Sequence, residues 1–323
     1  MAIQGDQRIS EPLRTKIREF AQQEGYFPND LAWGLRTGRT GLLGIVVPLT
    51  NSGFVSGLLD GAIQTFWEAG YFPVTLCSGL DLEAEARMLE SLARQRVEGV
   101  LLMPSREDSG KRHFAQLLKE HVSIVAINNP VPKLDLPLVA SDDVLGGELA
   151  TQHLIEAGHR RIFHLASPLD SRYADRRREI GYSCVMKNAG LRPGVLHYKE
   201  RLGWDGNDEA FHQKLLKLIS DQKSTAVFCF NDSVALKVYE FCHKAGIRIP
   251  DDLSIVGYSN ESWQGMNSLD FVSPPLTTVD QNTRKMGQTA AHLLLKLIND
   301  HSTTPMDALV EPRLVQRASV KKL

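Results

Sequence analysis

The chain alternates between short, continuous apolar runs and longer stretches whose apolar residues recur at helical spacing. Apolar runs without a polar alternation are typical of strands that are buried on both faces of a parallel sheet. The first series of predicted strands is 42–47, 72–76, 99–103, 123–127 and 138–140. Helices are predicted between these strands at 58–69, 82–95 and 111–119.

A second series with the same alternation follows. Its predicted strands are 161–166, 196–198, 226–230 and 253–258, and its predicted helices are 145–157, 177–189, 208–220 and 233–245. Repeated strand–helix segments of this length form doubly wound parallel sheets with right-handed crossovers. The pattern therefore predicts an α/β protein with two Rossmann-like, doubly wound parallel-sheet lobes. In such sheets a ligand binds beyond the carboxyl ends of the strands, so a site between the lobes is expected.

The order changes in the last fifty residues. Residues 281–299 predict one long helix, with Met286, Ala290, Leu294 and Ile298 at helical spacing. Residues 308–315 then predict a single strand.

The N-terminal forty residues predict two helices of different kinds. The first spans 12–25, with Ser10 as its cap and Leu13, Ile17 and Phe20 on one face. The second covers barely two turns after Asp30 and contains Gly34, which costs a helix about 1 kcal/mol relative to Ala. A helix this short is unstable alone, so we expect it to become ordered when a partner holds it.

Composition narrows the class of protein. The 323 residues are 42% hydrophobic and 23% charged, as in an ordinary globular protein. The net charge is −1, and the first 40 residues hold six Arg/Lys against five Asp/Glu, so any attraction to nucleic acid must be local. Four separated cysteines favour free thiols in a reducing compartment. No apolar run approaches the ~18 residues of a membrane span and no signal peptide is recognisable, so we expect a cytoplasmic protein without membrane contact.

Common enzyme motifs are absent from the sequence. There is no GxGxxG, no phosphate-binding GxxxxGK[ST], no HExxH and no GxSxG. Histidines, cysteines and carboxylates do not recur at catalytic or metal-ligand spacing. We therefore expect a protein that is not an enzyme and that uses no cofactor and no metal.

The segment from residue 28 to residue 48 carries a family resemblance. Pro28-Asn29, Leu31-Ala32, the run Leu35–Thr40 and the strand Gly44–Pro48 resemble the hinge and first strand of the lactose-repressor (LacI/GalR) family of regulators. The resemblance extends from about residue 8 to the C-terminus, and SPPLTTVDQ at 273–281 is similar to the family's crossover between lobes.

The resemblance implies a domain organisation. Residues 1–28 would be the remnant of a helix-turn-helix headpiece, and 29–40 the hinge helix and linker. The N-terminal lobe would comprise 41–142 with 280–302, and the C-terminal lobe 143–279 with 303–323. The helix at 12–25 is similar to the last headpiece helix, and the sequence as written lacks the helix that would read the major groove.

The resemblance also implies contacts with operator DNA. In the family, the hinge helices of a homodimer pair in the minor groove, where a leucine wedges between base pairs. Leu35 is similar to that leucine, and its alternative role is a small core residue in a linker. The DNA-binding residues that the resemblance implies are Asn29, Ala32, Leu35, Arg36 and Arg39.

Candidate residues for binding a small effector follow the predicted strands. Polar groups with one or two aromatic faces suit a small polar ligand. The candidates are Asn51, Phe54, Val55, Asn128, Asn129, Arg172, Arg178, Trp204, Asn231, Asp232 and Ser259. The resemblance implies that Arg178 forks onto the effector, and the alternative is a surface salt bridge with Glu179 or Asp175. Phe54 and Trp204 could equally pack the lobes.

Two departures from the family pattern concern the effector. Many members carry an aspartate where this chain has Asn128, and another where it has Ser259. Because carboxylates often bind sugar hydroxyls, their replacement weakens the prediction of a simple sugar. With Arg172 and Arg178 present, the alternative is an anionic effector, such as an anionic sugar derivative, or a less hydroxyl-rich one. The loop 259–272 is long, and Trp263 in it could cover the site. Replacing Arg178 by Ala is expected to abolish effector binding without unfolding the protein.

Two further similarities to the family are interpreted as structural. These are Asp142-Asp143 and the run Gly158–Ile162, in which Gly158 ends a helix. His159 and Arg160 would place cations at that helix's C-terminus.

The sequence thus predicts an effector-responsive transcriptional regulator, a repressor that acts as a homodimer on operator DNA. Two alternatives belong to other classes. A solute-binding protein shares the two-lobed fold but has no use for the hinge. A ligand sensor without DNA-reading function would lack the helix-turn-helix, as the chain does as written.

Overall fold

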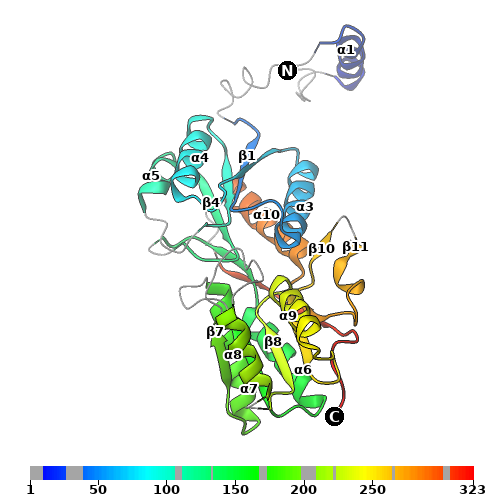
Figure 1. The fold of residues 1–323 in the computed structure, drawn as a ribbon. Coiled ribbons are helices and arrows are strands. Elements are labelled where there is room, and N and C mark those ends of the chain that lie inside the picture. Colours follow the sequence, from blue (N-terminus) through cyan, green and yellow to red (C-terminus); the bar gives the residue numbers. More distant parts are fainter. Residues whose placement is uncertain are drawn as a thin grey trace.

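The computed structural model describes residues 10–26, 39–105, 111–131, 134–166, 173–197, 209–220, 223–263, 266–300 and 306–323 (Figure 1). The short helix predicted after Asp30 lies outside these ranges. The described chain forms two lobes, each built on one six-stranded sheet with helices on both faces (Figure 1). This is the predicted α/β fold.

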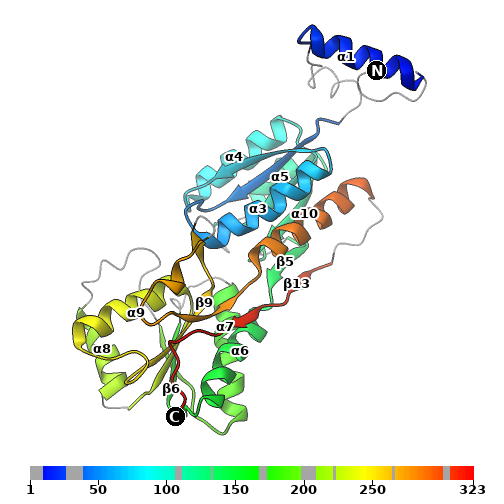
Figure 2. The ribbon, with the colours of Figure 1, turned by 90° about the vertical axis from the view of Figure 1, so that its right-hand side faces the viewer.

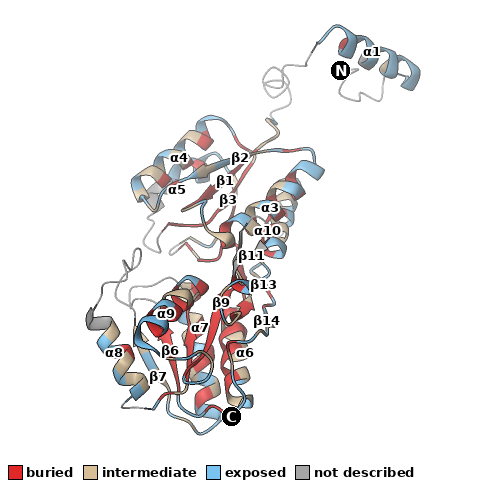
Figure 3. Cartoon of the chain, turned by 45° about the vertical axis from the view of Figure 1, so that its right-hand side comes forward, coloured by how far each residue is buried: buried red, intermediate tan, exposed pale blue. Residues whose placement is uncertain are grey.

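The first sheet has the strand order β13-β5-β4-β3-β1-β2, and every pair in it is parallel. Its strands are β1 (Leu42–Val47), β2 (Phe72–Cys77), β3 (Gly99–Leu102), β4 (Ser123–Ile127), β5 (Leu138–Ser141) and β13 (Ala308–Val310). The predicted bounds of β1 and β4 agree to the residue. Both faces of the central strands are buried, which is why their sequences are continuously apolar (Figure 3).

Four helices cover the first sheet. On one face lie α3 (Gly53–Glu68) and α10 (Thr283–Asn299), and on the other lie α4 (Leu82–Arg94) and α5 (Lys111–Lys119). The two helices α3 and α10 pack closely because of glycines: a Cβ at Gly61 would lie 2.1 Å from the carbonyl oxygen of Arg284. Although α3 was predicted from residue 58, it begins five residues earlier.

The second sheet has the order β14-β12-β9-β8-β6-β7 and is parallel except for the β12–β14 pair. Its strands are β6 (Ile162–Ala166), β7 (Gly194–His197), β8 (Ala226–Cys229), β9 (Ser254–Ser259), β12 (Thr277–Asp280) and β14 (Arg313–Val315). Helices α6 (Asp143–Glu156) and α7 (Tyr173–Asn188) pack on one face, and α8 (Glu209–Ser220) and α9 (Asp232–Ala245) on the other.

The chain crosses between the lobes after β5, after β12 and after β13. The segment predicted as one strand at 308–315 therefore forms two strands in different sheets, with Glu311 and Pro312 between them. Residues 308–310 pair with β5 of the first sheet, so the prediction that 303–323 belongs wholly to the second lobe is wrong for these residues. Figure 2 shows this segment running from one lobe to the other.

The long loop after β9 contains secondary structure of its own. Strands β10 (Ser262–Trp263) and β11 (Met266–Asn267) form a small antiparallel hairpin, followed by the 3-10 turn η1 (Ser268–Asp270). In the N-terminal part, α1 (Glu11–Gln23) forms close to the predicted 12–25 and ends two residues earlier; Ser10 occupies its N-cap position, without a side-chain hydrogen bond to the helix. The predicted apolar face of α1 is not covered: Leu13 and Phe20 are exposed.

Candidate functional site

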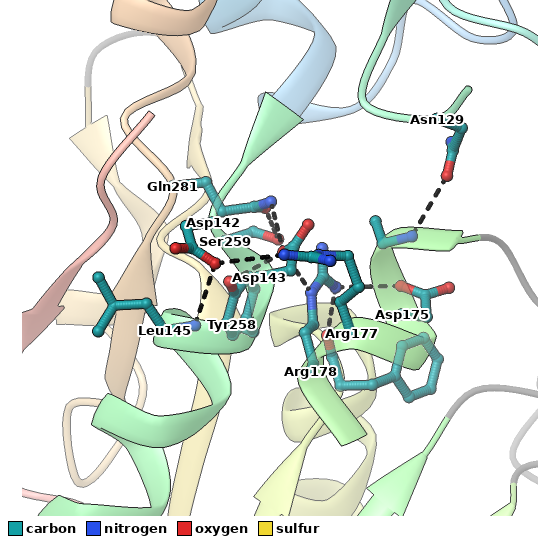
Figure 4. A network of polar contacts seen from close by, with 12 residues as sticks. Asn129, Asp142, Asp143, Leu145, Asp175, Arg177, Arg178, Tyr258, Ser259 and Gln281 are labelled. Carbon is teal, nitrogen blue, oxygen red and sulfur yellow. Dashed lines mark hydrogen bonds and ion pairs between the residues drawn. The ribbon is translucent and has the colours of Figure 1, made fainter. Parts of the chain in front are cut away.

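Polar side chains from both lobes lie at the carboxyl ends of the strands (Figure 4). Asn128 and Asn129 follow β4 of the first sheet, and Asp143, separated from β5 by Asp142, begins α6. Ser259 is the last residue of β9, and Arg178 lies in the second turn of α7. Parallel α/β sheets bind their ligands at the carboxyl ends of the strands, so these residues form the candidate site.

Arg178 is the centre of the network of polar contacts. Its Nε donates to Asp143 Oδ1 at 2.9 Å, and its Nη1 donates to Asp175 Oδ1 at 3.1 Å and to the carbonyl oxygen of Phe230 at 2.7 Å. Its Cζ lies 4.0 Å from the centroid of the Tyr258 ring. Within the described part of the chain, none of its hydrogen bonds uses Nη2, which leaves that nitrogen as a donor for a ligand.

Asp143 connects Arg178 to the rest of the second lobe. Its Oδ1 also accepts from the Tyr258 hydroxyl at 2.9 Å and from Gln281 Nε2 at 3.4 Å. Ser259 Oγ donates to Gln281 Oε1 at 3.1 Å. All of these side chains are buried, so the network holds α6, β9 and the segment after β12 in one arrangement (Figure 4).

The charge of Arg178 is balanced within the protein. Burial alone would lower the pKa of Arg178, but the carboxylates of Asp143 and Asp175 outweigh burial and raise this pKa. Beside this group, Arg177 Nη2 lies 3.6 Å from Asp142 Oδ1. The cluster thus holds two guanidinium groups and three carboxylates, and it offers no surplus of positive charge to an anion.

Glycines make the network possible. A Cβ at Gly147 of α6 would lie 2.3 Å from the carbonyl oxygen of Arg178, and a Cβ at Gly181 of α7 would lie 2.1 Å from that of Val144. The two helices therefore pack backbone against backbone. This close approach brings Asp143, at the start of α6, within reach of Arg178.

The amides of Asn128 and Asn129 are buried with polar atoms unpaired. Asn128 Oδ1 and Asn129 Nδ2 have no hydrogen-bond partner among the residues that the structure describes. Asn128 has a φ of 66°, a conformation that asparagine tolerates better than most residues. Asn129 Oδ1 accepts from the backbone N–H of Ala174 at 3.4 Å, which links the first lobe to the start of α7. A buried unpaired acceptor and a buried unpaired donor thus lie on adjacent residues.

Arg177 also presents an unpaired atom. Its Nη1 donates to the Tyr173 hydroxyl at 3.3 Å, and its guanidinium lies over the Tyr173 ring at 5.4 Å. Its Nε is buried and has no partner in the described ranges. The side chain is fixed by Tyr173 and Asp142 and retains a donor at the site.

Several predicted effector residues have other partners. Asn51 is exposed, whereas Phe54 and Val55 are buried in the core of the first lobe. For Phe54 this supports the alternative of lobe packing. Asn231 caps α9, because its Oδ1 accepts from Val234 N at 2.8 Å. Phe54, Val55 and Asn231 therefore have structural roles, and Asn231 directly follows Phe230, whose carbonyl oxygen accepts from Arg178.

Asp232 is buried in the second lobe and fully bonded. It accepts from Thr278 Oγ1 at 2.6 Å and from the backbone N–H of Glu261 at 3.1 Å. Burial raises the pKa of Asp232 to about 6, and these donors limit the rise. The carboxylate thereby ties the start of α9 to β12 and to the loop after β9.

Other predicted residues lie outside the described part of the chain. These are Arg172 and Trp204 of the effector set, and Asn29, Ala32, Leu35 and Arg36 of the DNA-binding set. The side chain of Trp263 is likewise not described. Arg39 is described, and its Nε donates to Glu98 Oε2 of the first lobe at 3.0 Å.

Tyr258 and Gln281 join the Arg178 network without having been predicted, and Asp143 joins it although the sequence indicated only a structural role. All three lie at the carboxyl end of a strand or just after one, so the rule that selected Asn128 could also have selected them. Another interpretation needs correction. His159 is buried, its Nδ1 lies 2.8 Å from Thr225 Oγ1, and burial lowers its pKa, so it is not a cation at the end of α6. Arg160 does donate to the carbonyl oxygen of Ile155 there, as predicted.

Two other kinds of feature are absent from the described ranges. No group of three or more His, Cys, Asp or Glu side chains in them could hold a metal ion. No helix among these residues is long and apolar enough to cross a membrane.

Comparison with known proteins places this geometry in a wider context. Residues 151–320 match the family described as periplasmic binding protein-like domain. The ribose operon repressor of Escherichia coli (strain K12) is 30% identical over 318 residues, which are 98% of this chain and 93% of that protein. The HTH-type transcriptional repressor PurR of Vibrio cholerae serotype O1 (strain M66-2) is 30% identical over 331 residues, 98% and 91% of the two chains.

Solved structures give the same result. A complex of the transcriptional regulator CelR with cellobiose superposes with a TM-score of 0.73 at 30% identity, covering 98% of this chain and 94% of that one. A LacI family transcriptional regulator from Enterococcus faecalis V583 with bound ribose has a TM-score of 0.73 at 26% identity, covering 87% and 99%. These similarities extend over both lobes.

Proposed function

The chain belongs to the lactose-repressor (LacI/GalR) family of effector-responsive transcriptional regulators, and we propose that its effector is a small, neutral, hydroxyl-rich molecule of the sugar class. The effector binds where the strand ends of the two lobes meet, beside Arg178. The observation that carries this proposal is the balance of charge around Arg178. The relatives that span 98% of this chain are named as repressors, which does not favour the solute-binding alternative.

Charge balance disfavours an anionic effector. Asp143 and Asp175 each accept from Arg178 at 3.1 Å or less, so a phosphate or carboxylate on the ligand would compete with two carboxylates for one guanidinium. Burying an additional negative charge beside them carries a large desolvation cost. A hydroxyl group adds no charge and can accept from the remaining nitrogen of Arg178.

The two asparagines support the same class of ligand. Asn128 offers an acceptor and Asn129 a donor, both buried and unpaired in the described part of the chain. A hydroxyl group both donates and accepts, so one hydroxyl can satisfy each of these atoms. An anionic oxygen can only accept, and it would leave Asn128 Oδ1 unpaired at a cost of about 1–3 kcal/mol.

The proposed mechanism couples ligand binding to the angle between the lobes. A ligand that contacts Asn128 and Asn129 of one lobe and Arg178 of the other stabilises one relative orientation. In a homodimer this orientation sets the spacing of the two hinge segments at the operator. Shifting a population from mostly one state to mostly the other requires on the order of 5 kcal/mol of differential affinity.

The test is ligand-dependent thermal stability of the purified full chain. Neutral pentoses, hexoses and disaccharides are compared with their phosphorylated and carboxylated derivatives. We expect one neutral sugar to raise the melting temperature in a concentration-dependent way, and its phosphorylated form not to. Asn129→Ala should remove the shift, whereas Asn188→Ala, at an exposed position at the end of α7, should keep it. Stabilisation by a phosphorylated sugar alone would contradict the proposal.

A further inference from the structure

The carboxylate of Glu98 lies where the chain enters the first lobe. Its Oε2 accepts from Arg39 Nε at 3.0 Å, and its Oε1 accepts from the backbone N–H of Gly41 at 2.8 Å. Arg39 Nη2 also contacts the Tyr71 hydroxyl. One carboxylate thus holds both the side chain and the backbone of the segment that leads from the predicted hinge into β1.

Further bonds fix the same three residues of the linker. Thr40 Oγ1 donates to the carbonyl oxygen of Arg96 at 2.8 Å, and the carbonyl oxygen of Gly41 accepts from Phe72 N at 2.8 Å. Gly41 has a φ of +70°, a conformation that favours glycine, and it turns the backbone so that both of its polar groups reach the lobe. The segment 39–41 is therefore attached to the starts of β2 and β3 at several points.

The attachment lies at the amino ends of the strands of the first sheet, opposite the carboxyl ends where the candidate site lies. Gly41, Tyr71 and Glu98 each directly precede a strand, at the amino ends of β1, β2 and β3, whereas Asn128 follows the carboxyl end of β4. A strand of six residues such as β1 spans about 20 Å. The rigid sheet thus lies between the place where the effector would bind and the place where the linker is held.

Burial differs between the two partners. The side chain of Glu98 is 11% exposed and that of Arg39 is 51% exposed. Glu98 belongs to the lobe and is fixed there, while Arg39 reaches it from the linker. A nearly buried carboxylate that loses its partners is costly, so the lobe favours the linker conformation in which Arg39 and Gly41 are bonded.

We propose that Glu98 is a positioning residue for DNA binding, which fixes the direction in which the hinge segment leaves the first lobe. In this role Arg39 serves the protein rather than the DNA: its charge is committed to Glu98, and it is not a phosphate contact. Removing Glu98 frees the linker, and ordering it again on DNA then costs conformational entropy.

The experiment measures DNA affinity of the full chain as a function of salt. The probes are labelled duplexes tiled across the region upstream of its own gene, and the tightest-binding duplex is used for all variants. Glu98→Ala removes both linker contacts, and Glu98→Gln keeps a carbonyl oxygen that can accept from Gly41. Glu90→Ala is the matched control, because Glu90 carries the same charge on the same lobe and its partner is local: among the described residues it pairs with Arg94 of its own helix, at 2.9 Å.

We expect Glu98→Ala to bind DNA about tenfold more weakly than Glu90→Ala at every salt concentration. The slope of log affinity against log salt concentration should be unchanged. Glu98→Gln should bind about as tightly as the control. Thermal unfolding of each variant sets an assay temperature at which all are folded. Equal affinities of Glu98→Ala and Glu90→Ala would overturn the proposal. So would tighter binding by Glu98→Ala with a slope steeper by about one, because Arg39 would then be a phosphate contact that Glu98 restrains.

A second variant keeps the test decisive if Glu98→Ala does not fold. Arg39→Met removes the same ion pair from its exposed side. A positioning role predicts weaker DNA binding with an unchanged salt slope. A slope that is shallower by about one would identify Arg39 as a phosphate contact and would refute the assignment.

Discussion

Arg178 and Asp143 form a buried ion pair across the α6–α7 packing, with Nε 2.9 Å from Oδ1 and side chains 6% and 1% exposed. The two residues are 35 positions apart in the sequence, and their ion pair joins the two helices. Arg178 therefore has a structural role besides the one proposed toward the effector. The expectation that it can be replaced by Ala without affecting folding does not fit this geometry.

Arg178→Ala should destabilise the second lobe by about 3–5 kcal/mol, because it leaves Asp143 buried and uncompensated. Adding Asp143→Asn should recover part of this loss by removing the buried charge. The measurement is the denaturation midpoint of both variants in urea. Unfolding is monitored with an optical probe in each lobe, because the two lobes need not unfold together. A midpoint unchanged by Arg178→Ala would show that the pair contributes little to stability.

Asn128→Asp should tighten binding of a neutral sugar and weaken binding of any anion. The φ of 66° at this position is also accessible to aspartate. A charged acceptor strengthens a hydrogen bond from a hydroxyl by about 1 kcal/mol, or about fivefold in affinity. Isothermal titration with the sugar found by thermal shift measures the change. A lower affinity for the neutral sugar would indicate that Asn128 acts as a donor rather than as an acceptor.

Two buried groups should give opposite slopes of stability against pH. Burial lowers the pKa of His164 to about 3, so the unfolded chain binds more protons and stability falls as the pH drops below about 6.5, by about 1.4 kcal/mol per pH unit. Burial raises the pKa of Asp232 to about 6, so the folded chain binds more protons and stability is lost as the pH rises from about 4 to about 6.

The two effects can be separated by substitution. Relative to the unsubstituted chain, His164→Gln should become more stable as the pH falls from 6 to 4, and Asp232→Asn should become less stable. Urea denaturation at several pH values measures both differences. Parallel pH profiles for all three proteins would mean that neither group is titrated on unfolding in this range.

Gly147→Ala should separate α6 from α7 and reduce effector binding. The added Cβ would lie 2.3 Å from a backbone oxygen, which a side-chain rotation cannot relieve. Overpacking of this kind costs about 1–3 kcal/mol. Gly194→Ala is the matched control, since its Cβ would meet only Phe163 Cβ at 3.9 Å. Equal stability and equal ligand affinity of the two variants would contradict the role given to the Gly147 contact.

The alternating pattern of strands and helices was predictable because burial on both faces leaves a continuous apolar run. Strands β1 and β4 and helix α5 were predicted to the residue. The segment 308–315 was not, because its two halves are both apolar and only Glu311-Pro312 separates them. Whether such a segment stays in one sheet depends on partners distant in sequence, which periodicity does not report.

The position of the candidate site at the strand ends could be predicted from the sequence, but the hydrogen bonds between its residues could not. Asn128, Asn129 and Ser259 were selected because they lie at predicted strand ends. Arg178 was selected because of the family resemblance. Neither criterion reveals that Arg178 is bonded to Asp143, Asp175 and Phe230, because these pairings arise from helix packing. Glu98 carries no sequence signal either: its partners are a linker arginine 59 positions away and a backbone amide.

The return of the chain to the first lobe has a consequence for its synthesis. Helix α10 supplies Met286, Ala290 and Leu294 to the core beneath the first sheet, and β13 completes the edge of that sheet. A nascent chain that has reached only β5 therefore exposes one apolar face and one unpaired strand. Such surfaces bind chaperones and aggregate readily. The lobe that is translated first therefore cannot reach its final packing until residues 283–310 have been made, and a released chain that ends before residue 283 should be more sensitive to protease in this lobe than the full chain.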